Sequence, residues 1–490
     1  MHALRSPLSA ASLCLLLAAP AALSLAACES SDETEAPQPT LTGAAGVTIT
    51  EVSIYQGVKR TLAQNGQPVA ANVPLVAERT ALVRVFYGAA PEAVGQSLVG
   101  RLEITGRAPL DVPFTAAAAS LEHDLATTLN FDVPAEWMTD PFGYRVSILS
   151  LGLADNAAAH YPVGAPEILP VEGPRNVFRV VIAPFEYNAD GSGRVPDTSP
   201  AAVESFRQRL LQLYPVSNVE VTVRAPEPWN QAIQPDGTGW QEVGIRLFGI
   251  RNNEAPSQDY YYFGLFDPAA SFFQFCGMGC LLGVTLLNDT PADVGNPQLR
   301  LGLGVGFPEY ARDTMAHELG HAHGREHVNC GQGLDPQSID PNYPYSGQTI
   351  GAWGFDIVNH ALVDPAVYSD IMGYCDTQWI SDYNFAALLA RGKNVNLPRY
   401  HEPVARVRYE LVAVGADSAA FAEPAELAPL AGPTVRAKLR RAGGSEVEVG
   451  AHYFAYDHLP GGWLLFPAGE ERVVRAELAL GGRTFVAARP

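Results

Sequence analysis

The sequence predicts a multidomain α+β protein in which a central α/β domain lies between N- and C-terminal β-sandwich-like domains. The chain has 490 residues, more than one hydrophobic core usually supports. Short alternating and β-branched segments fill both ends of the chain, whereas a strand–helix–strand pattern occupies the middle. We therefore expect three domains, at residues 46–172, 173–398 and 399–490.

The composition is that of a folded, acidic protein. Hydrophobic residues make up 47% and charged residues 17% of the chain, which argues against an intrinsically disordered class. The formal net charge of −20 argues against a basic surface for phosphates, so we expect no nucleic-acid partner. The sequence does not indicate an oligomeric state.

The first 27 residues are typical of an export signal. Arg5 provides the positive charge, and the apolar run that follows ends in Leu-Ala-Ala-Cys28, which resembles the lipobox of bacterial lipoproteins. The resemblance implies cleavage before Cys28 and lipidation of this cysteine, hence a membrane anchor at the cell envelope. The outer membrane is favoured because Glu29 follows. A plain secretory signal with a chance cysteine and an uncleaved membrane anchor are the alternatives.

The next two segments differ in pattern. Residues 28–45 are acidic, contain proline and lack large apolar side chains, so they predict a flexible tether. From residue 46 the pattern is that of strands, because Val47–Tyr55 alternates and Thr80–Tyr87 is β-branched and aromatic. Residues 46–172 therefore predict a β-domain, and they contain no cluster of catalytic residue types.

The central segment mixes strands and helices. Val177–Ala183 predicts an apolar strand, Ser199 and Pro200 are typical of a helix start, and Val219–Val223 predicts a second strand. Leu299–Phe307 alternates large apolar residues with glycine, which predicts a strand with one bare face that another backbone can approach. After a predicted helix the strand pattern returns. These last strands are Val404–Val412, Glu446–Tyr453, Trp463–Phe466, Val473–Leu480 and Phe485–Ala488.

A histidine-rich motif, H-E-L-G-H-A-H-G-R-E-H, lies within the central segment. On a helix, His317 and His321 project from the same face and can bind one metal ion, with Glu318 close enough to act as a general base on a metal-bound water. Gly324 can end the helix and let His327 return as the third ligand. Three histidines and a water are typical of a catalytic zinc site.

This motif resembles that of the metzincins, H-E-x-x-H-x-x-G-x-x-H, which a methionine turn follows downstream. The turn is found here as Ser-Asp-Ile-Met372-Gly-Tyr374-Cys. The resemblance covers about residues 175–395 and implies a metzincin-like zinc protease domain with one Zn²⁺ per chain. It also implies that Met372 forms an apolar floor and that Tyr374 approaches the metal and stabilises the oxyanion. An ordinary buried tyrosine is the alternative for Tyr374.

The expected function is hydrolysis of peptide bonds in extracytoplasmic proteins or glycoproteins, through a zinc-activated water with Glu318 as general base. We expect the peptide to lie along the Leu299–Phe307 strand as an added strand. A second interpretation is a surface adhesin or glycan-binding lipoprotein with an inactive or minor zinc domain. In a third, residues 46–170 form an inhibitory prodomain, although they contain no cysteine to act as a switch.

Four cysteines beyond Cys28 remain in the predicted mature chain: Cys276, Cys280, Cys330 and Cys375. Four cysteines permit three pairings. We favour Cys276–Cys280, because the two glycines between them allow a tight turn, and Cys330–Cys375, which would close a long loop. A second metal site made of these thiols is the alternative, which export to an oxidising compartment disfavours.

Other residues near the motif are less suited to binding a metal. His323 lies about 200° round the helix from His321 and should face away. Glu326 could replace His327 as a ligand, but the motif spacing favours the histidine. Calcium is a further candidate cofactor, at aspartates in predicted loops: Asp190, Asp197, Asp335 and Asp340. No twelve-residue calcium-loop pattern supports it, so solvated turns are favoured.

Overall fold

A computed structural model shows how the chain folds. It describes residues 40–254, 256–287, 296–330, 338–346, 349–375, 377–397 and 405–489. The predicted export signal at residues 1–27, Cys28 and most of the predicted tether lie outside the described residues. Every helix within the described ranges is too short or too polar to cross a membrane.

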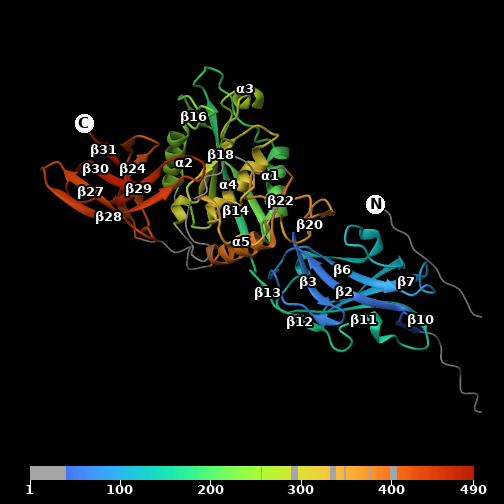
Figure 1. Cartoon of the computed structure of the whole chain (residues 1–490). Helices are drawn as coiled ribbons and strands as arrows, with labels where there is room; N and C mark the ends of the chain where they lie inside the picture. Colours follow the sequence, from blue (N-terminus) through green and yellow to red (C-terminus); the bar gives the residue numbers. More distant parts are fainter. Residues whose placement is uncertain are drawn as a thin grey trace, which may run out of the picture. The chain divides into compact units, whose positions relative to one another are not determined.

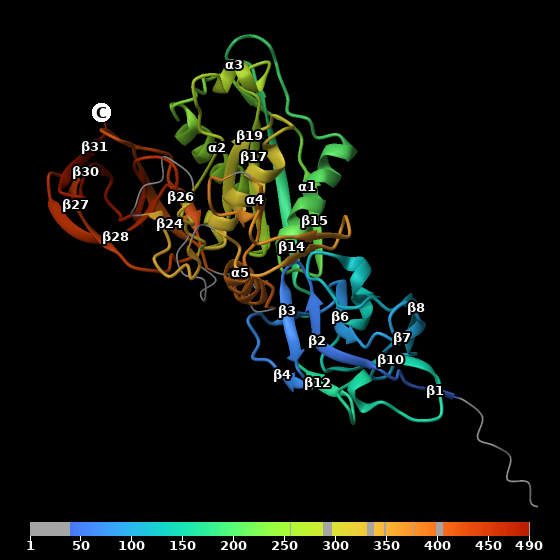
Figure 2. The ribbon, with the colours of Figure 1, turned by 45° about the vertical axis from the view of Figure 1, so that its right-hand side comes forward.

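The predicted fold class is wrong. In the described part of the chain 41% of residues are in strands and 17% in helices, so the protein is mostly β. The C-terminal strands form one sheet that bends nearly into a barrel (Figures 1 and 2), not two stacked layers. The structure is therefore not a metzincin-like α/β domain flanked by β-sandwiches. Side chains alternate along strands in sandwiches and barrels alike, so the sequence pattern does not distinguish the two.

Two antiparallel sheets enclose one core in the N-terminal region. The first sheet contains β1 (Thr40–Gly43), β10 (Phe142–Gly152), β7 (Ser97–Ile104), β8 (Leu110–Thr115), β11 (His160–Tyr161) and β12 (Glu167–Leu169). The second contains β4 (Gln67–Pro68), β3 (Lys59–Gln64), β2 (Val47–Tyr55), β6 (Ala81–Ala89) and β9 (Leu129–Val133). Strand β1 falls within the segment predicted as a tether and pairs with β10.

A short parallel pair, β5 (Leu75–Val76) and β13 (Val171–Glu172), follows the N-terminal sheets. Arg79, which is 1% exposed, joins this region to the middle of the chain. Its guanidinium donates hydrogen bonds to the carbonyl oxygens of Leu211 and Val216, at 2.7 and 3.0 Å. Short 3-10 helices lie at Leu125–Thr127, Ala135–Trp137, Ala157–Ala159 and, further along the chain, Pro297–Leu299.

The middle region is built on a six-stranded sheet. Its strands are β15 (Asn218–Val223), β14 (Val177–Tyr187), β17 (Tyr260–Phe266), β19 (Leu301–Val305), β18 (Gly283–Thr285) and β16 (Glu227–Trp229). All pairs are parallel except that β18 runs antiparallel to β19. Because β18 has only one neighbouring strand, it forms an edge of the sheet among the described strands.

Helices cover both faces of this sheet (Figure 1). The helices of the region are α1 (Pro200–Leu213), α2 (Trp240–Glu254), α3 (Phe272–Cys276), α4 (Ala311–Ala322) and α5 (Asp382–Val395). Helices α1 and α4 share a core with Val180 and Ile182 of β14, whereas α2 packs in a second core with Val181. Since successive side chains of a strand point to opposite faces, α1 and α4 lie on one face and α2 on the other. Two short pairs accompany them, β20 (Gly354–Asp356) with β21 (Ala361–Val363) and β22 (Ser369–Asp370) with β23 (Gln378–Trp379).

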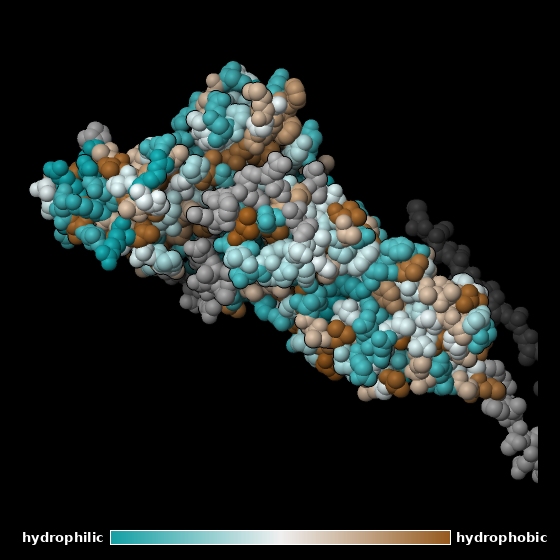
Figure 3. All heavy atoms as spheres, in the orientation of Figure 1, coloured by the Kyte–Doolittle hydropathy of each residue, from teal (hydrophilic) through white to brown (hydrophobic). Residues whose placement is uncertain are grey.

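The C-terminal region is an eight-stranded sheet. Its strands are β25 (Ala419–Phe421), β24 (Val407–Val414), β29 (Gly462–Pro467), β28 (Glu446–Ala455), β27 (Val435–Arg441), β30 (Val473–Leu480), β31 (Arg483–Ala488) and β26 (Ala425–Leu427). The two ends of the sheet, β25 and β31, lie close to each other, which nearly closes it. Trp463 of β29 is fully buried and contacts Phe248 of α2, with ring centroids 5.1 Å apart. On the face of the molecule shown in Figure 3, hydrophobic residues are scattered among hydrophilic ones.

Candidate metal centre

Helix α4 packs closely on the sheet because two positions of β19 are glycines. A β-carbon at Gly302 would lie 3.2 Å from Cβ of Glu318, and one at Gly304 would lie 3.1 Å from Cγ2 of Thr314. The bare strand face expected from the glycine alternation therefore receives α4. This packing buries His317, Glu318 and His321.

Gly324 ends α4 and returns the chain towards the helix. Its φ of +80° is a backbone conformation that favours glycine. The following backbone amide, of Arg325, donates to the carbonyl oxygen of Gly320 at 3.0 Å, and His327 then lies beside the two helix histidines. His323 is outside the cluster, and its ring stacks on that of Tyr261 with centroids 4.3 Å apart.

The Nε2 atoms of four histidine side chains lie close together. His321 Nε2 lies 3.0 Å from His317 Nε2 and 3.1 Å from His327 Nε2. The fourth ring belongs to His458, between β28 and β29, whose Nε2 lies 3.2 Å from His317 Nε2 and 3.0 Å from His327 Nε2. In tetrahedral zinc sites with Zn–N of about 2.05 Å the ligand nitrogens are about 3.3 Å apart. The four rings thus form a group that could hold a metal ion.

The hydrogen bonds of the Nδ1 atoms show that the other ring nitrogen, Nε2, presents its lone pair to the cluster. His317 Nδ1 lies 2.7 Å from the carbonyl oxygen of Ile371, and His321 Nδ1 lies 2.6 Å from that of Arg325. A carbonyl oxygen only accepts, so both Nδ1 atoms donate and both Nε2 atoms carry lone pairs. Burial lowers the pKa of His317 to about 4 and that of His327 to about 3, so these rings are neutral at pH 7. Facing lone pairs at these distances repel each other unless a cation lies between them.

The turn that follows β22 packs against α4 and against the segment that carries His327. Met372 is 1% exposed, and a β-carbon at Gly320 would lie only 2.4 Å from its Sδ atom. The carbonyl oxygen of Met372 accepts from the backbone amide of Val328 at 2.9 Å, which fixes the residue next to His327. The fully buried Asp370 carboxylate orders the turn by accepting from the backbone amides of Met372 and Ser381.

Both favoured cysteine pairs lie at disulfide distance. The Cα atoms of Cys276 and Cys280 are 4.8 Å apart, and those of Cys330 and Cys375 are 5.5 Å apart. The second pair joins the segment that carries His327 to the methionine turn. With both pairs bonded, the alternative of a second metal site made of thiols is excluded.

Two carboxyl groups lie beside the histidines. Glu318 is 1% exposed, and its Oε1 lies 3.9 Å from His458 Nε2. Asp457 Oδ2 lies 3.4 Å from both His321 Nε2 and His458 Nε2, and it has no hydrogen-bond partner in the described part of the chain. Burial raises the pKa of Glu318 well above its ordinary value, and the Asp457 carboxylate beside it raises it further. Burial raises the pKa of Asp457 to about 7. The Asp457 carboxyl group thus interacts with Glu318 and also faces imidazole lone pairs, an arrangement that a cation would stabilise.

Tyr374 reaches the cluster from the methionine turn. Its hydroxyl lies 3.0 Å from His458 Nδ1 and 3.3 Å from His327 Nε2. The side chain is 39% exposed, so it is not an ordinary buried tyrosine. Burial of the hydroxyl end raises its pKa, which keeps it protonated and able to donate.

The expected substrate strand is wrong. The stretch Leu299–Phe307 contributes β19, which has β17 on one side and β18 on the other and therefore offers no free edge. Strand β18 was missed because it is only three residues long and follows a glycine-rich disulfide loop. An added strand needs an edge, so β18 is the position to consider.

The side chains of the other candidates within the described residues are not part of the cluster. Glu326 is exposed, whereas His327 is 1% exposed and lies in the cluster. Asp190 pairs with Arg194 at 2.7 Å, and Asp340 pairs with Arg325 at 3.0 Å. Asp197 accepts from the backbone amide of Ser199 at 2.8 Å, before α1. Asp335 lies outside the described residues.

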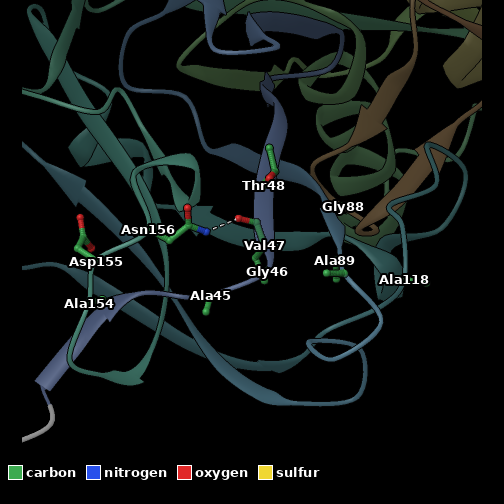
Figure 4. A pocket seen from close by; sticks show the side chains of 11 residues that line it. Ala45, Gly46, Val47, Thr48, Gly88, Ala89, Ala118, Ala154, Asp155 and Asn156 are labelled. Carbon is green, nitrogen blue, oxygen red and sulfur yellow. Dashed lines mark hydrogen bonds between the residues drawn. The ribbon is translucent and has the colours of Figure 1, made fainter.

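Sequence reasoning missed Asp457 and His458. They lie in a connection between two strands, with no fixed spacing to the motif that could have identified them. A hollow also lies between N-terminal strands (Figure 4), where the Asn156 amide donates to the Val47 carbonyl oxygen at 2.7 Å. Alanine and glycine make up most of its lining, so it offers little chemistry.

Comparison of the chain with models of known protein families finds no match, and comparison with curated proteins finds none either.

Proposed function

We propose that this protein is a zinc-dependent endopeptidase that hydrolyses peptide bonds of extracytoplasmic proteins or glycoproteins. The observation that carries the proposal is the convergence of the Nε2 atoms of His317, His321 and His327 beside Glu318, a residue of the same helix. The resemblance to metzincins rests on the motif and the methionine turn alone, since the predicted fold class is wrong.

Each residue of the site has a chemical role in this proposal. The three motif histidines would hold zinc, which supplies a Lewis acid and lowers the pKa of a water molecule. Glu318 would accept a proton from the attacking water and deliver it to the leaving amine. The Tyr374 hydroxyl would donate a hydrogen bond to the negative charge that develops on the substrate carbonyl oxygen.

Export and lipid anchoring at Cys28 form part of the same proposal. The two disulfides support an oxidising, extracytoplasmic compartment. Mass spectrometry of the N-terminal peptide, isolated from the membrane fraction of a bacterial host, tests the anchor. We expect a peptide that begins at an acylated Cys28, and an unmodified peptide in the soluble fraction would contradict the anchor.

The catalytic proposal is tested by zinc content and casein cleavage of a chain that begins at residue 29, with and without Glu318→Gln. We expect one zinc per chain in both proteins, because the substitution keeps the ligands. Cleavage by the parent chain should be abolished by a chelator. The variant should cleave about 10²–10⁴-fold more slowly, the usual contribution of a general base. Equal and measurable cleavage by both proteins, or no zinc in the parent chain, would overturn the proposal.

One observation favours the second function, a surface adhesin or glycan-binding lipoprotein with an inactive zinc site. A fourth imidazole, from His458, gives the closed ligand set typical of structural zinc. If this reading is correct, zinc is bound but casein is not cleaved, even after His458 has been replaced by alanine.

A further inference from the structure

A segment of the C-terminal region covers the edge of the middle sheet. Residues 285–287, which begin at the end of β18, pair antiparallel with residues 455–457. The Leu287 amide donates to the Ala455 carbonyl oxygen at 2.9 Å, and the Asp457 amide donates to the Thr285 carbonyl oxygen at 3.1 Å. A single bridge between Leu286 and Tyr456 and these two hydrogen bonds thus place a segment of the chain itself at the edge where an extended peptide substrate would add.

The next residue occupies the metal position that a catalytic site keeps open. His458 Nε2 lies as close to the Nε2 atoms of His317 and His327 as the motif histidines lie to each other, at 3.0–3.2 Å. The side chain of His458 is 10% exposed, and its Nδ1 is held by the Tyr374 hydroxyl at 3.0 Å. A zinc ion bound by four imidazoles has no position for water.

Asp457 completes the blockage. Its Oδ1 accepts from the backbone amides of Thr285 and His458, at 2.9 and 2.8 Å, which fixes the carboxyl group in place. Its Oδ2 and an Oε atom of Glu318 both lie within the same small group of metal-ligating atoms. The Asp457 carboxyl group thus lies directly beside Glu318 and the histidine cluster.

Packing of the C-terminal sheet holds the segment in position. Trp463 Nε1 donates to the hydroxyl of Tyr456 at 2.6 Å, and both side chains belong to the core that includes α2. A side chain at Gly237 would collide with that of Leu459, so the residue after His458 is also tightly packed. The segment therefore belongs to a defined interface.

We propose that residues 455–458 are an internal pseudosubstrate that keeps the protease latent. The segment pairs with the residues at the end of β18, places His458 where it would cap a metal ion and places Asp457 beside Glu318. A peptide substrate needs all three positions, so the segment and the substrate exclude each other. The inference rests on the proposed function, and it predicts activation when the C-terminal sheet is displaced or its loop is cut.

The test uses the full chain loaded with cobalt(II), whose visible absorption reports its ligands, and titration with acetohydroxamate, a small chelating ligand. The variants are His458→Ala and, as a matched control, His452→Ala, a histidine of the preceding strand β28 outside the cluster. We expect the spectrum of His458→Ala to shift with acetohydroxamate at a concentration at least tenfold lower than that needed for the parent chain and the control. Casein cleavage by the zinc form of His458→Ala should rise at least tenfold over the parent chain.

The outcomes separate the two proposals. A parent chain that binds cobalt and responds to acetohydroxamate as strongly as His458→Ala would overturn latency and leave the metal site intact. A parent chain that binds no cobalt would overturn the proposed function together with the inference. If the His458→Ala variant does not fold, the parent chain decides the first point by itself: a cobalt spectrum that shifts with acetohydroxamate overturns latency, and one that does not shift supports it.

Discussion

The two β-rich ends of the chain, similar in sequence pattern, relate to the candidate site in different ways. The N-terminal sheets join the middle region through Arg79, which donates to carbonyl oxygens at the end of α1. They contribute no residue to the histidine cluster. The C-terminal sheet supplies Asp457 and His458. One end thus contacts the middle region structurally, while the other adds side chains to the candidate metal site.

The largest effect on stability is expected at the N-terminal contact. Arg79→Ala removes the donors of at least three carbonyl oxygens and leaves them buried, which should lower the free energy of unfolding by about 3 kcal/mol or more. Zinc content should stay at one per chain, because no ligand is touched. Chemical denaturation and metal analysis measure the two quantities.

The exposed Arg107, also in the N-terminal region, provides the control. Arg107→Ala should change stability by about 0.5 kcal/mol or less, as exposed substitutions usually do. Loss of zinc from a folded Arg79→Ala protein would contradict the comparison, since it would give the N-terminal end a part in the metal site.

The next effect is on zinc affinity, which should differ between substitutions of His321 and His458. His321→Ala should abolish stoichiometric zinc binding, because this ring lies at the centre of the motif and contacts two other ligands. His458→Ala should keep one zinc, bound roughly 100-fold less tightly, since a ligand is lost but the three-histidine set remains. Competition with a chromogenic chelator measures both.

His160 offers the matched N-terminal substitution. It is a buried histidine of β11 whose ring nitrogens lie at hydrogen-bond distance from Ser147 and Asp155. It is not part of the histidine cluster. His160→Ala should leave zinc affinity unchanged. If His458→Ala bound zinc as tightly as the parent chain, the C-terminal end would have no more part in the site than the N-terminal end.

The smallest effect is expected at the packing of the C-terminal segment. Tyr456→Phe removes the acceptor for Trp463 Nε1 and should lower stability by about 1 kcal/mol. Amide exchange at residues 455–458 should become faster, because the segment is held less firmly. The same substitution at Tyr161, in the N-terminal region, should leave exchange in this segment unchanged. Equal exchange in both variants would show that Tyr456 does not hold the segment.

The sequence predicts part of the site because that part is local. His317, Glu318 and His321 lie on one helix, and Gly324 returns His327, so spacing alone brings these residues together. The Cys276–Cys280 pair also follows from a local turn. By contrast, His458 lies 131 residues after His327 in the sequence and reaches the site through strand pairing at residues 285–287. No periodicity encodes such a contact.

The fold was predicted less well, for a related reason. Alternation identifies strands such as β2 and β28 but not how a sheet closes. The C-terminal sheet closes through a contact between its two end strands, β25 and β31, which are far apart in the sequence. Likewise, β18 is too short to give a sequence pattern. The sequence therefore places the peptide along the neighbouring glycine-rich strand instead. Long-range contacts decide both features.

The most direct test of the central claim is a crystal structure of the zinc-loaded full chain with anomalous diffraction recorded at the zinc edge. We predict one strong peak within about 2.0–2.1 Å of the Nε2 atoms of His317, His321, His327 and His458. A peak bound by the three motif histidines and a water, with His458 turned away, would contradict the closed site. The absence of any peak at the cluster would contradict the metal centre itself.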